Sequence, residues 1–317
     1  MRRRGSLDGR AAHPPNPFAA RRTRHEGSPM AAAGASIDAV FFDFDGTLTD
    51  AEACAAPFLE AFQERVARRA GLDRHPLVEA WRRLAADVDA HPERHGWVVD
   101  GRVVAPACAD PYLRASRVAK LLLSDALPDA ERDEAVDHDF ADSYRHVRTV
   151  FRDEATEIVD AVLASGRAAC VVSNTRASWI EARLATLPLR FGPVPVAGEA
   201  AKWSITASAR APERLGRVPE ALSLDGLARP VLLRRGRYLD ALVTMEAALG
   251  VRLDRVLVCG DVFELDLGLP HALGAHVHLV ARATTPRYEL RAIAELPRAG
   301  VSEGLGAVRA RLGLARR

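Results

Sequence analysis

The chain has 317 residues, of which 48% are hydrophobic and 27% charged, and its formal net charge is +2. This length predicts two structural units and is enough to bury a sizeable core. No stretch approaches the roughly 20 consecutive apolar residues that span a bilayer, so we exclude a membrane protein. The four cysteines show no CxxC spacing, which favours a reducing, cytoplasmic setting.

Residues 1–35 are expected to form a disordered, arginine-rich leader. Residues 1–29 hold seven arginines against Asp8 and Glu26 and almost no aliphatic residues, a composition typical of disorder. Such a segment could bind nucleic acid or act as a transit peptide. We favour a dispensable tail over nucleic-acid binding, because a compact sequence begins at Met30, just before the first expected strand.

The most informative segment is DFDGT, which begins at Asp43 and follows the apolar run 39–42. The run predicts a buried strand, and the glycine lets the chain turn sharply after it. Asp43 and Asp45 are two residues apart in an extended segment, so both carboxylates can face one cleft. One can attack phosphorus while the other handles a proton. Taken alone, the segment could also be a surface turn.

The next hundred residues are predicted to be mostly helical. Pro57 and Pro76 would each begin a helix, and apolar periodicity indicates further helices near 113–123 and 136–147. The segment 97–104 interrupts this run and predicts a hairpin with an Asp-Gly turn. We expect the aromatic side chains on these helices to form a core rather than to contact a ligand.

A second predicted strand, 168–172, ends in Ser173, Asn174 and Thr175. These polar residues could simply cap the following helix. The same residues could also bind an anion, because helix N-termini are favourable sites for anions.

One lysine, Lys202, lies between the second and last polar segments, and it is one of only two lysines among the 44 Lys and Arg residues. Because arginine dominates this chain, a retained lysine is informative, and its compact ammonium differs in reach from a guanidinium. About sixty residues separate Lys202 from the next acidic segment, more than one βα unit needs. An insertion that covers about 203–230 would account for this length.

The last polar segment follows a predicted strand at 254–260 and contains Asp261, Glu264 and Asp266. Magnesium prefers oxygen ligands and keeps several waters, so a few carboxylates suffice to bind it. We expect Glu264 to be a solvated residue in the first turn of a helix. A final strand is expected at 277–280.

Strands and helices alternate along this part of the chain, which predicts a doubly wound parallel sheet of the α/β class. The polar segments all fall where strands end, at the edge of such a sheet that binds ligands.

These four segments together resemble the haloacid dehalogenase superfamily, in particular its phosphatase-type members, whose motifs include D-x-D-G-[TV] and G-D-x-x-x-x-D. The resemblance implies a Rossmann-like catalytic core of residues 36–50 and 152–317 and a helical cap of residues 51–151. It also implies a Mg²⁺-dependent hydrolase that cleaves a small phosphorylated metabolite, a phosphomonoester, through an aspartyl-phosphate intermediate.

The resemblance also implies a role for each site residue. The catalytic residues would be Asp43 as nucleophile, Asp45 as acid and base, and Lys202 as the charge-balancing cation. Either the insertion at about 203–230 explains the distance between Lys202 and Asp261, or Arg234 or Arg235 takes this role, and we favour Lys202. The phosphate-binding residues would be Thr47, Ser173 and Asn174, and the metal ligands Asp43, Asp45, Asp261 and Asp266.

Two other functions stay open. A sugar phosphomutase of the same superfamily keeps both acids of the first motif, and a binding protein could retain the fold without catalysis. Dehalogenation is disfavoured by Asp45, because by this resemblance the dehalogenases lack an acid at that position.

Overall fold

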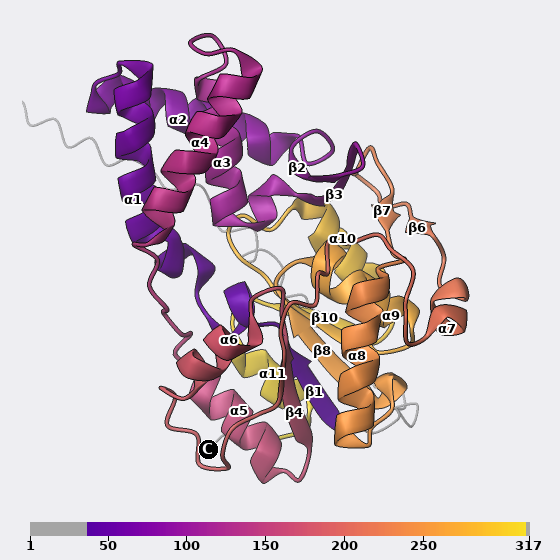
Figure 1. Ribbon diagram of the computed structural model, residues 1–317. Coiled ribbons are helices and arrows are strands. Elements are labelled where there is room, and N and C mark those ends of the chain that lie inside the picture. The colour runs from indigo at the N-terminus through magenta and orange to yellow at the C-terminus, as the bar shows by residue number, and fades with distance from the viewer. Residues whose placement is uncertain (1–36, 315–317) are drawn as a thin grey trace, which may run out of the picture. The chain divides into compact units, whose positions relative to one another are not determined.

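The computed structural model describes residues 37–314, so the leader expected at residues 1–35 lies outside the described residues (Figure 1). The strands are β1 (Ala39–Phe42), β2 (Gly96–Val99), β3 (Arg102–Pro106), β4 (Ala168–Val172), β5 (Val196–Ala197), β6 (Ala221–Leu222), β7 (Val231–Leu232), β8 (Val256–Gly260), β9 (His276–Val280) and β10 (Ala299–Ser302). The helices are α1 (Ala51–Ala70), α2 (Arg74–Ala90), α3 (Pro111–Leu122), α4 (Asp129–Tyr144), α5 (Ala155–Ala164), α6 (Ala177–Leu184), α7 (Pro212–Gly216), α8 (Gly236–Leu249), α9 (Gly268–Ala272), α10 (Arg287–Glu295) and α11 (Gly306–Arg311). Short helical turns are η1 (Phe44–Leu48), η2 (Ala107–Ala109), η3 (Leu253–Arg255) and η4 (Phe263–Leu267).

A six-stranded parallel sheet forms the centre of this fold, in the order β10-β9-β8-β1-β4-β5. Strand β1 pairs on one side with β4 and on the other with β8, so Phe42 lies opposite Val171 and Cys259. The predicted α/β class with a doubly wound parallel sheet is therefore confirmed.

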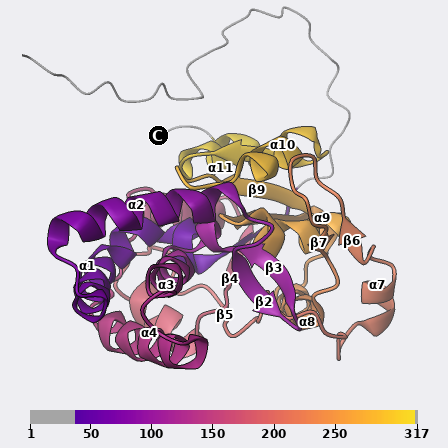
Figure 2. The ribbon, with the colours of Figure 1, turned by 90° about the horizontal axis from the view of Figure 1, so that it is seen from above.

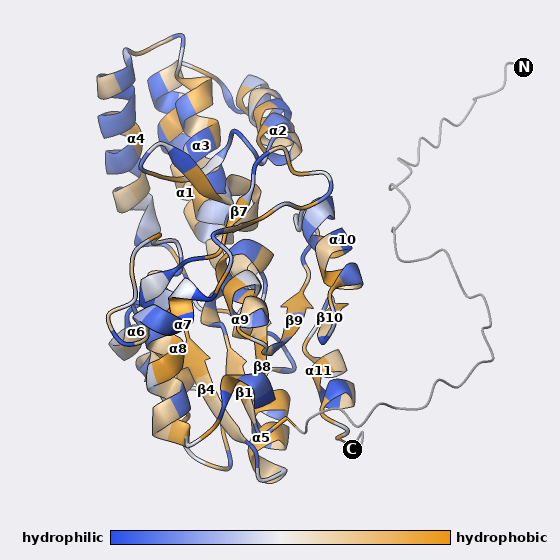
Figure 3. Ribbon diagram, turned by 90° about the vertical axis from the view of Figure 1, so that its right-hand side faces the viewer, coloured by the Kyte–Doolittle hydropathy of each residue, from blue (hydrophilic) through white to orange (hydrophobic). Residues whose placement is uncertain are grey.

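Both faces of the sheet are buried, because successive side chains of a strand point to opposite sides. Ala39 and Phe41 pack in one apolar cluster with α8, α9 and α10, whereas Val40 and Phe42 pack in another with α5, α6 and α11. The hydrophobic colouring of β1, β4 and β8 in Figure 3 reflects this position between two layers of helices.

Helices α1 to α4 and the hairpin β2–β3 form a helical segment with an apolar cluster of their own, built around Phe58, Phe62 and Trp81 (Figure 2). The hairpin turns at Asp100 and Gly101, whose φ angles of 48° and 72° suit a tight Asp-Gly turn. The predicted hairpin is thus confirmed. Among residues 37–314, none of the helices combines the length and the apolar character that crossing a membrane requires.

Two predicted boundaries are wrong. Pro57 does not begin a helix but lies inside α1, because Asp50 caps the helix earlier by accepting a hydrogen bond from the Ala53 N–H. The strand at 277–280 is not the last one, since β10 adds a parallel strand beside β9. Strand β10 is short and contains Gly300, which weakens its sequence signal.

The stretch between Lys202 and α8 holds α7 and a small antiparallel pair, β6–β7, which lies beside β3 of the helical segment (Figures 1 and 2). Arg229 of this stretch reaches Glu264 in η4 with both terminal nitrogens, at 2.7 and 2.9 Å. The expectation that Glu264 is solvated is therefore wrong. Its side chain is fully buried, and the Tyr288 hydroxyl also donates a hydrogen bond to it.

Removal of the Arg229 guanidinium should destabilise the protein strongly, because it leaves the buried Glu264 carboxylate without a cation. We expect Arg229→Ala to lower the free energy of unfolding by about 3–5 kcal/mol, measured by urea denaturation. Arg291→Ala is the matched control, because Arg291 pairs at 2.9 Å with a largely exposed Asp225 and should cost less than about 1 kcal/mol. Equal effects of the two substitutions would contradict this account.

Candidate active site

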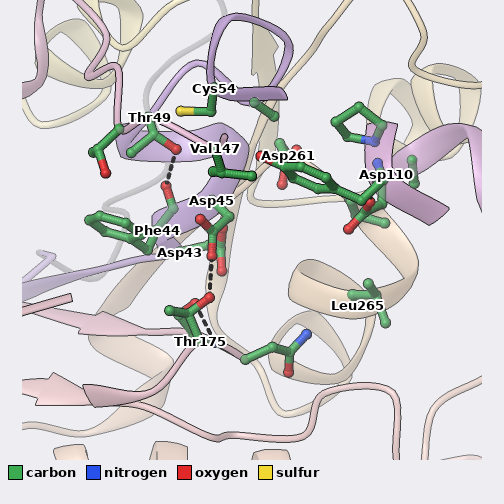
Figure 4. Close-up of a pocket in the computed structure, with 18 of the residues that line it drawn as sticks. Asp43, Phe44, Asp45, Thr49, Cys54, Asp110, Val147, Thr175, Asp261 and Leu265 are labelled. Carbon is green, nitrogen blue, oxygen red and sulfur yellow. Dashed lines mark hydrogen bonds between the residues drawn. The ribbon is translucent and has the colours of Figure 1, made fainter. Parts of the chain in front are cut away.

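The polar residues at the ends of β1, β4 and β8 meet at one edge of the sheet. Asp43 follows β1, Ser173 follows β4 and Asp261 follows β8, and these three strands are neighbours. Parallel strands that pair in register end at the same edge, which brings side chains from distant parts of the sequence together. All three residues line one cavity, shown in Figure 4.

Lys202 provides the cation of this edge. Its Nζ donates to Asp43 Oδ1 at 2.6 Å and to Asp266 Oδ1 at 2.7 Å, and only 1% of the lysine side chain is exposed. Arg234 instead contacts the Val218 carbonyl and Glu220. The structure thus brings Lys202, and not Arg234, to the carboxylates.

Arg235 does not contact Asp43 either. Its fully buried guanidinium donates to the backbone carbonyls of Lys202 at 2.6 Å, Val104 at 2.7 Å and Leu232 at 3.0 Å. It therefore fixes the backbone that carries the lysine rather than replacing its charge.

Asp261 and Asp266 form a buried acidic group with Asp43. One carboxylate oxygen from each of the three residues lies within 4.8 Å of the other two. The Nε of Arg282 lies 3.0 Å from Asp261 Oδ2. Gly46 allows this close packing, since a Cβ at that position would come within 2.0 Å of the same oxygen. Its φ of 84° is also a conformation that glycine adopts without strain.

Burial dominates the electrostatics of these groups. It raises the pKa of Asp43 to about 7, although Lys202 acts in the opposite direction. It also raises the pKa of Asp261 well above the ordinary value, against the effect of Arg282. Burial alone would lower the pKa of Lys202, but Asp266 and Asp43 outweigh it and raise the pKa above that of a free lysine.

The charges at this edge fit a divalent cation. The buried carboxylates of Asp43, Asp261 and Asp266 lie close to the ammonium of Lys202 and the guanidinium of Arg282. When ionised, these three acids exceed the two cations by one negative charge in a buried place, which is costly without a counter-ion. Clustered carboxylate oxygens are the ligands that hard divalent cations prefer.

Asp45 faces the cavity beside Asp43 and accepts a hydrogen bond from Thr175 Oγ1 at 2.6 Å (Figure 4). The protein packed around Asp45 raises its pKa, and the Thr175 hydroxyl acts to lower it. Thr175 was not predicted as a site residue. Its place next to Ser173 and Asn174 was the available signal, and the pairing of β1 with β4 brings it to Asp45.

The remaining predicted residues have different positions. Ser173 lines the cavity and accepts a hydrogen bond from the Thr175 N–H at 3.1 Å, and Asn174 Oδ1 accepts one from the Lys202 N–H at 2.7 Å. Thr47 is fully buried and is not among the residues that line the cavity.

The cavity measures about 220 Å³ and is closed on one side by the helical segment. Tyr112, Tyr144 and Asp110 of that segment line it, together with Val147. The expectation that the aromatic side chains serve only as core is therefore wrong for Tyr144, which is 40% exposed. The core is built instead by Phe58 and its neighbours.

Core arginines hold the helical segment at this cavity through its backbone. Arg282 donates to the carbonyl of Ala109, Arg235 to that of Val104, and Arg229 to that of Pro92. The segment is thus tied to the core at three carbonyl oxygens.

Comparison with known protein families identifies the chain. The sequence model of the haloacid dehalogenase-like hydrolases matches residues 37–203, more than half of the sequence. The chain belongs to the haloacid dehalogenase-like hydrolase family. The match includes Asp43, Ser173 and Lys202 and ends before Asp261, so that last acidic group rests on the geometry described above. No match was found among the curated proteins.

Several solved structures are similar to this chain. A HAD family hydrolase from Deinococcus radiodurans R1, with bound phosphate and sodium, is 19% identical, with 88% of this chain and 96% of that chain covered and a TM-score of 0.50. A HAD phosphatase from Thermococcus onnurineus is 16% identical, covering 89% and 100% of the two chains with a TM-score of 0.43. A 2-haloacid dehalogenase from Pseudomonas syringae pv. Tomato DC3000 is 15% identical, covering 87% and 98% with a TM-score of 0.40. The likeness to the Deinococcus radiodurans structure supports the fold alone, because the identity is only 19%.

Loss of the Lys202 ammonium should destabilise the protein in a pH-dependent way. The pKa of Asp43 is already raised from 3.8 to about 7, and Lys202→Met removes the cation that opposes this shift. When the pKa of a carboxyl group is higher in the folded than in the unfolded state, the free energy of unfolding falls as pH rises, because the unfolded protein ionises more readily. We therefore expect the decrease in Tm to be larger at pH 8 than at pH 5.

Lys120→Met serves as the control for that substitution, because Lys120 pairs at 3.5 Å with Asp133 and Asp137 on the surface. Its Tm should change little at either pH. A Lys202→Met protein whose Tm deficit is the same at both pH values would contradict the proposed charge balance.

Proposed function

We propose that this protein is a Mg²⁺-dependent phosphatase that hydrolyses a small phosphomonoester through an aspartyl-phosphate on Asp43. The observation that carries the proposal is the pairing of two carboxylates at one cavity, Asp43 held by Lys202 and Asp45 held by Thr175. A nucleophile needs an ionised carboxylate, which the Lys202 cation favours. A proton donor needs a raised pKa, which its surroundings give Asp45.

In the first step, an Asp43 oxygen forms a bond to phosphorus and the bond to the leaving oxygen breaks. Asp45 donates its proton to that leaving oxygen, so the alcohol departs neutral. Lys202, within hydrogen-bond distance of the Asp43 carboxylate, balances the charge that gathers on the phosphoryl oxygens. Ser173 lines the same cavity and its hydroxyl can donate to a phosphoryl oxygen.

In the second step, Asp45, now ionised, takes a proton from water as the water attacks phosphorus. The bond to Asp43 breaks, inorganic phosphate leaves, and both carboxyl groups return to their initial states. The same side chain thus acts as acid and then as base. Thr47 has no part in this proposal, because its buried hydroxyl neither lines the cavity nor forms a hydrogen bond to another described residue, whereas Lys202 contacts Asp43 directly.

The acidic group is the place where Mg²⁺ would bind, through Asp43, Asp261 and Asp266 and the backbone carbonyl of Asp45. The excess of negative charge in this buried group supports a cation, and its clustered carboxylate oxygens favour Mg²⁺. Mg²⁺ would supply further positive charge next to the phosphoryl oxygens.

We also propose that residues 51–151 act as a cap that selects the substrate, with residues 36–50 and 152–317 as the catalytic core. The cap contributes Asp110, Tyr112 and Tyr144 to the cavity. At about 220 Å³, the cavity is smaller than the roughly 300–1,000 Å³ typical of sites for drug-sized ligands. A small metabolite therefore fits it better than a polymer.

The experiment that tests the function is a panel of phosphate esters incubated with the purified protein and Mg²⁺. Release of inorganic phosphate is the expected result. Isomerisation of a sugar phosphate without release would favour the mutase, and release of halide from 2-haloacids in place of phosphatase activity would contradict the assignment of Asp45.

Substitution of the nucleophile or removal of the metal should abolish hydrolysis. We expect Asp43→Asn to reduce turnover of 4-nitrophenyl phosphate by at least roughly 10³-fold, because no covalent intermediate can form. Chelation should also stop turnover, and added Mg²⁺ should restore it. Asp254→Asn is the control, since Asp254 pairs with Arg252 on the surface. Substantial turnover by Asp43→Asn would refute the mechanism.

The Thr175 hydroxyl should set the pH range of the first step. It donates to the ionised Asp45 carboxylate and lowers its pKa, so Thr175→Val should raise that pKa. Because the first step needs protonated Asp45, the high-pH limb of kcat/KM should move to higher pH. Thr186→Val, which removes only a bond to the Arg183 carbonyl, should leave the limb in place. An unchanged or lowered limb in Thr175→Val would argue against Asp45 as the acid.

A further inference from the structure

The mouth of the cavity differs in charge from its interior. Inside it lie the carboxylates already described, together with Asp110, whose side chain caps α3 by accepting from the Tyr112 and Leu113 N–H groups. The basic residues that line the cavity are Arg148, in the connection between α4 and α5, and Arg183, on α6. We call Tyr144, Arg148, Trp179 and Arg183 the rim.

Neither rim arginine forms an ion pair or a hydrogen bond with a carboxylate within residues 37–314, although this chain pairs many of its arginines. Arg183 contacts the Thr149 hydroxyl, the Trp179 carbonyl and the Trp179 ring, and none of these carries a charge. The backbone N–H of Arg148 donates to the Cys54 carbonyl, and its guanidinium forms no hydrogen bond to another described residue. Two guanidinium groups that line the cavity without a direct carboxylate contact are suited to bind an anion there.

Arg183 is held in place rather than free to move. Its Nε donates to Thr149 Oγ1 at 2.5 Å, its Nη1 donates to the Trp179 carbonyl at 3.1 Å, and its Cζ lies 5.3 Å from the centroid of the Trp179 ring. These contacts leave Nη2 without a protein partner within the described residues. A fixed guanidinium binds a carboxylate or phosphate with less loss of side-chain entropy than a mobile one.

We propose that the substrate carries a second anionic group, a carboxylate or a second phosphate, on the leaving part of the molecule, and that Arg183, assisted by Arg148, binds it. This inference rests on the proposed phosphatase function and gives the class of its substrate. Arg183 and Asp45 line the same cavity, so the guanidinium shares that cavity with the proposed proton donor of the leaving group.

A stacked aromatic ring fits the rim less well. Trp179 is 46% exposed, but guanidinium groups already lie over its ring, Arg183 at 5.3 Å and Arg176 at 5.8 Å. The exposed part of the rim therefore offers mainly positive charge, which suits an anion on a small acyclic leaving group in a cavity of about 220 Å³.

The test compares two probes of similar size, 3-phosphoglycerate and sn-glycerol 3-phosphate, which differ by one carboxylate. Dissociation constants are measured by calorimetry with Asp43→Asn protein and Mg²⁺, so that turnover does not interfere. We expect 3-phosphoglycerate to bind roughly ten- to a hundredfold more tightly, as one charge-assisted hydrogen bond predicts. Adding Arg183→Gln should bring the ratio of the two constants close to one, and Arg183→Lys should restore part of it.

Arg176→Gln is the matched control, because Arg176 also lies over the Trp179 ring but is not among the residues that line the cavity. In Asp43→Asn protein that also carries Arg176→Gln, the ratio of the two dissociation constants should equal that of Asp43→Asn alone. A ratio of one or less before substitution, or equal effects of Arg183→Gln on both probes, would overturn the inference. So would an equal loss with Arg176→Gln.

The phosphatase function is tested separately, by hydrolysis of 4-nitrophenyl phosphate by the unsubstituted protein. Hydrolysis without a preference for the acidic probe would reject the inference alone, whereas absence of hydrolysis of every ester would reject the function.

Discussion

The contact of one ammonium with two carboxylates is the constraint on which this site depends. Lys202 lies between Asp43 and Asp266, and nearly all of its side chain is buried. Burying three charges is costly unless each has a partner at close range, so the surrounding backbone must hold them within narrow limits. The Asn174 side chain, the Arg235 guanidinium and the Tyr238 hydroxyl serve this purpose by bonding the backbone of Lys202 or Asp266.

The Lys202 contact neutralises only part of the negative charge of the buried carboxylates. A cluster whose charges were fully balanced would have little electrostatic attraction for a metal ion. Here the buried acids outnumber the cations, and burial raises the pKa values of Asp43 and Asp261. Under the proposed function, a bound cation would offset the cost of these buried charges.

The sequence allowed prediction of features that depend on neighbours along the chain. Apolar runs that end in acids predicted β1 and β8, and Lys202 was selected by the family resemblance together with its order along the chain and the rarity of lysine. Features that depend on distant pairing were missed. Glu264 looked solvated because its partner Arg229 comes from the stretch between Lys202 and α8, and Thr175 meets Asp45 only because β1 lies beside β4. A local pattern contains no information about such pairs.

The way in which arginines hold the helical segment bears on how this protein could evolve. Arg229, Arg235 and Arg282 bind the carbonyl oxygens of Pro92, Val104 and Ala109, and every amino acid offers such an oxygen. Side chains in this stretch can therefore be exchanged without loss of these three bonds, provided the backbone keeps its path. Substitutions among these side chains could therefore change the shape and charge of the cavity without disturbing the carboxylates at the ends of β1 and β8.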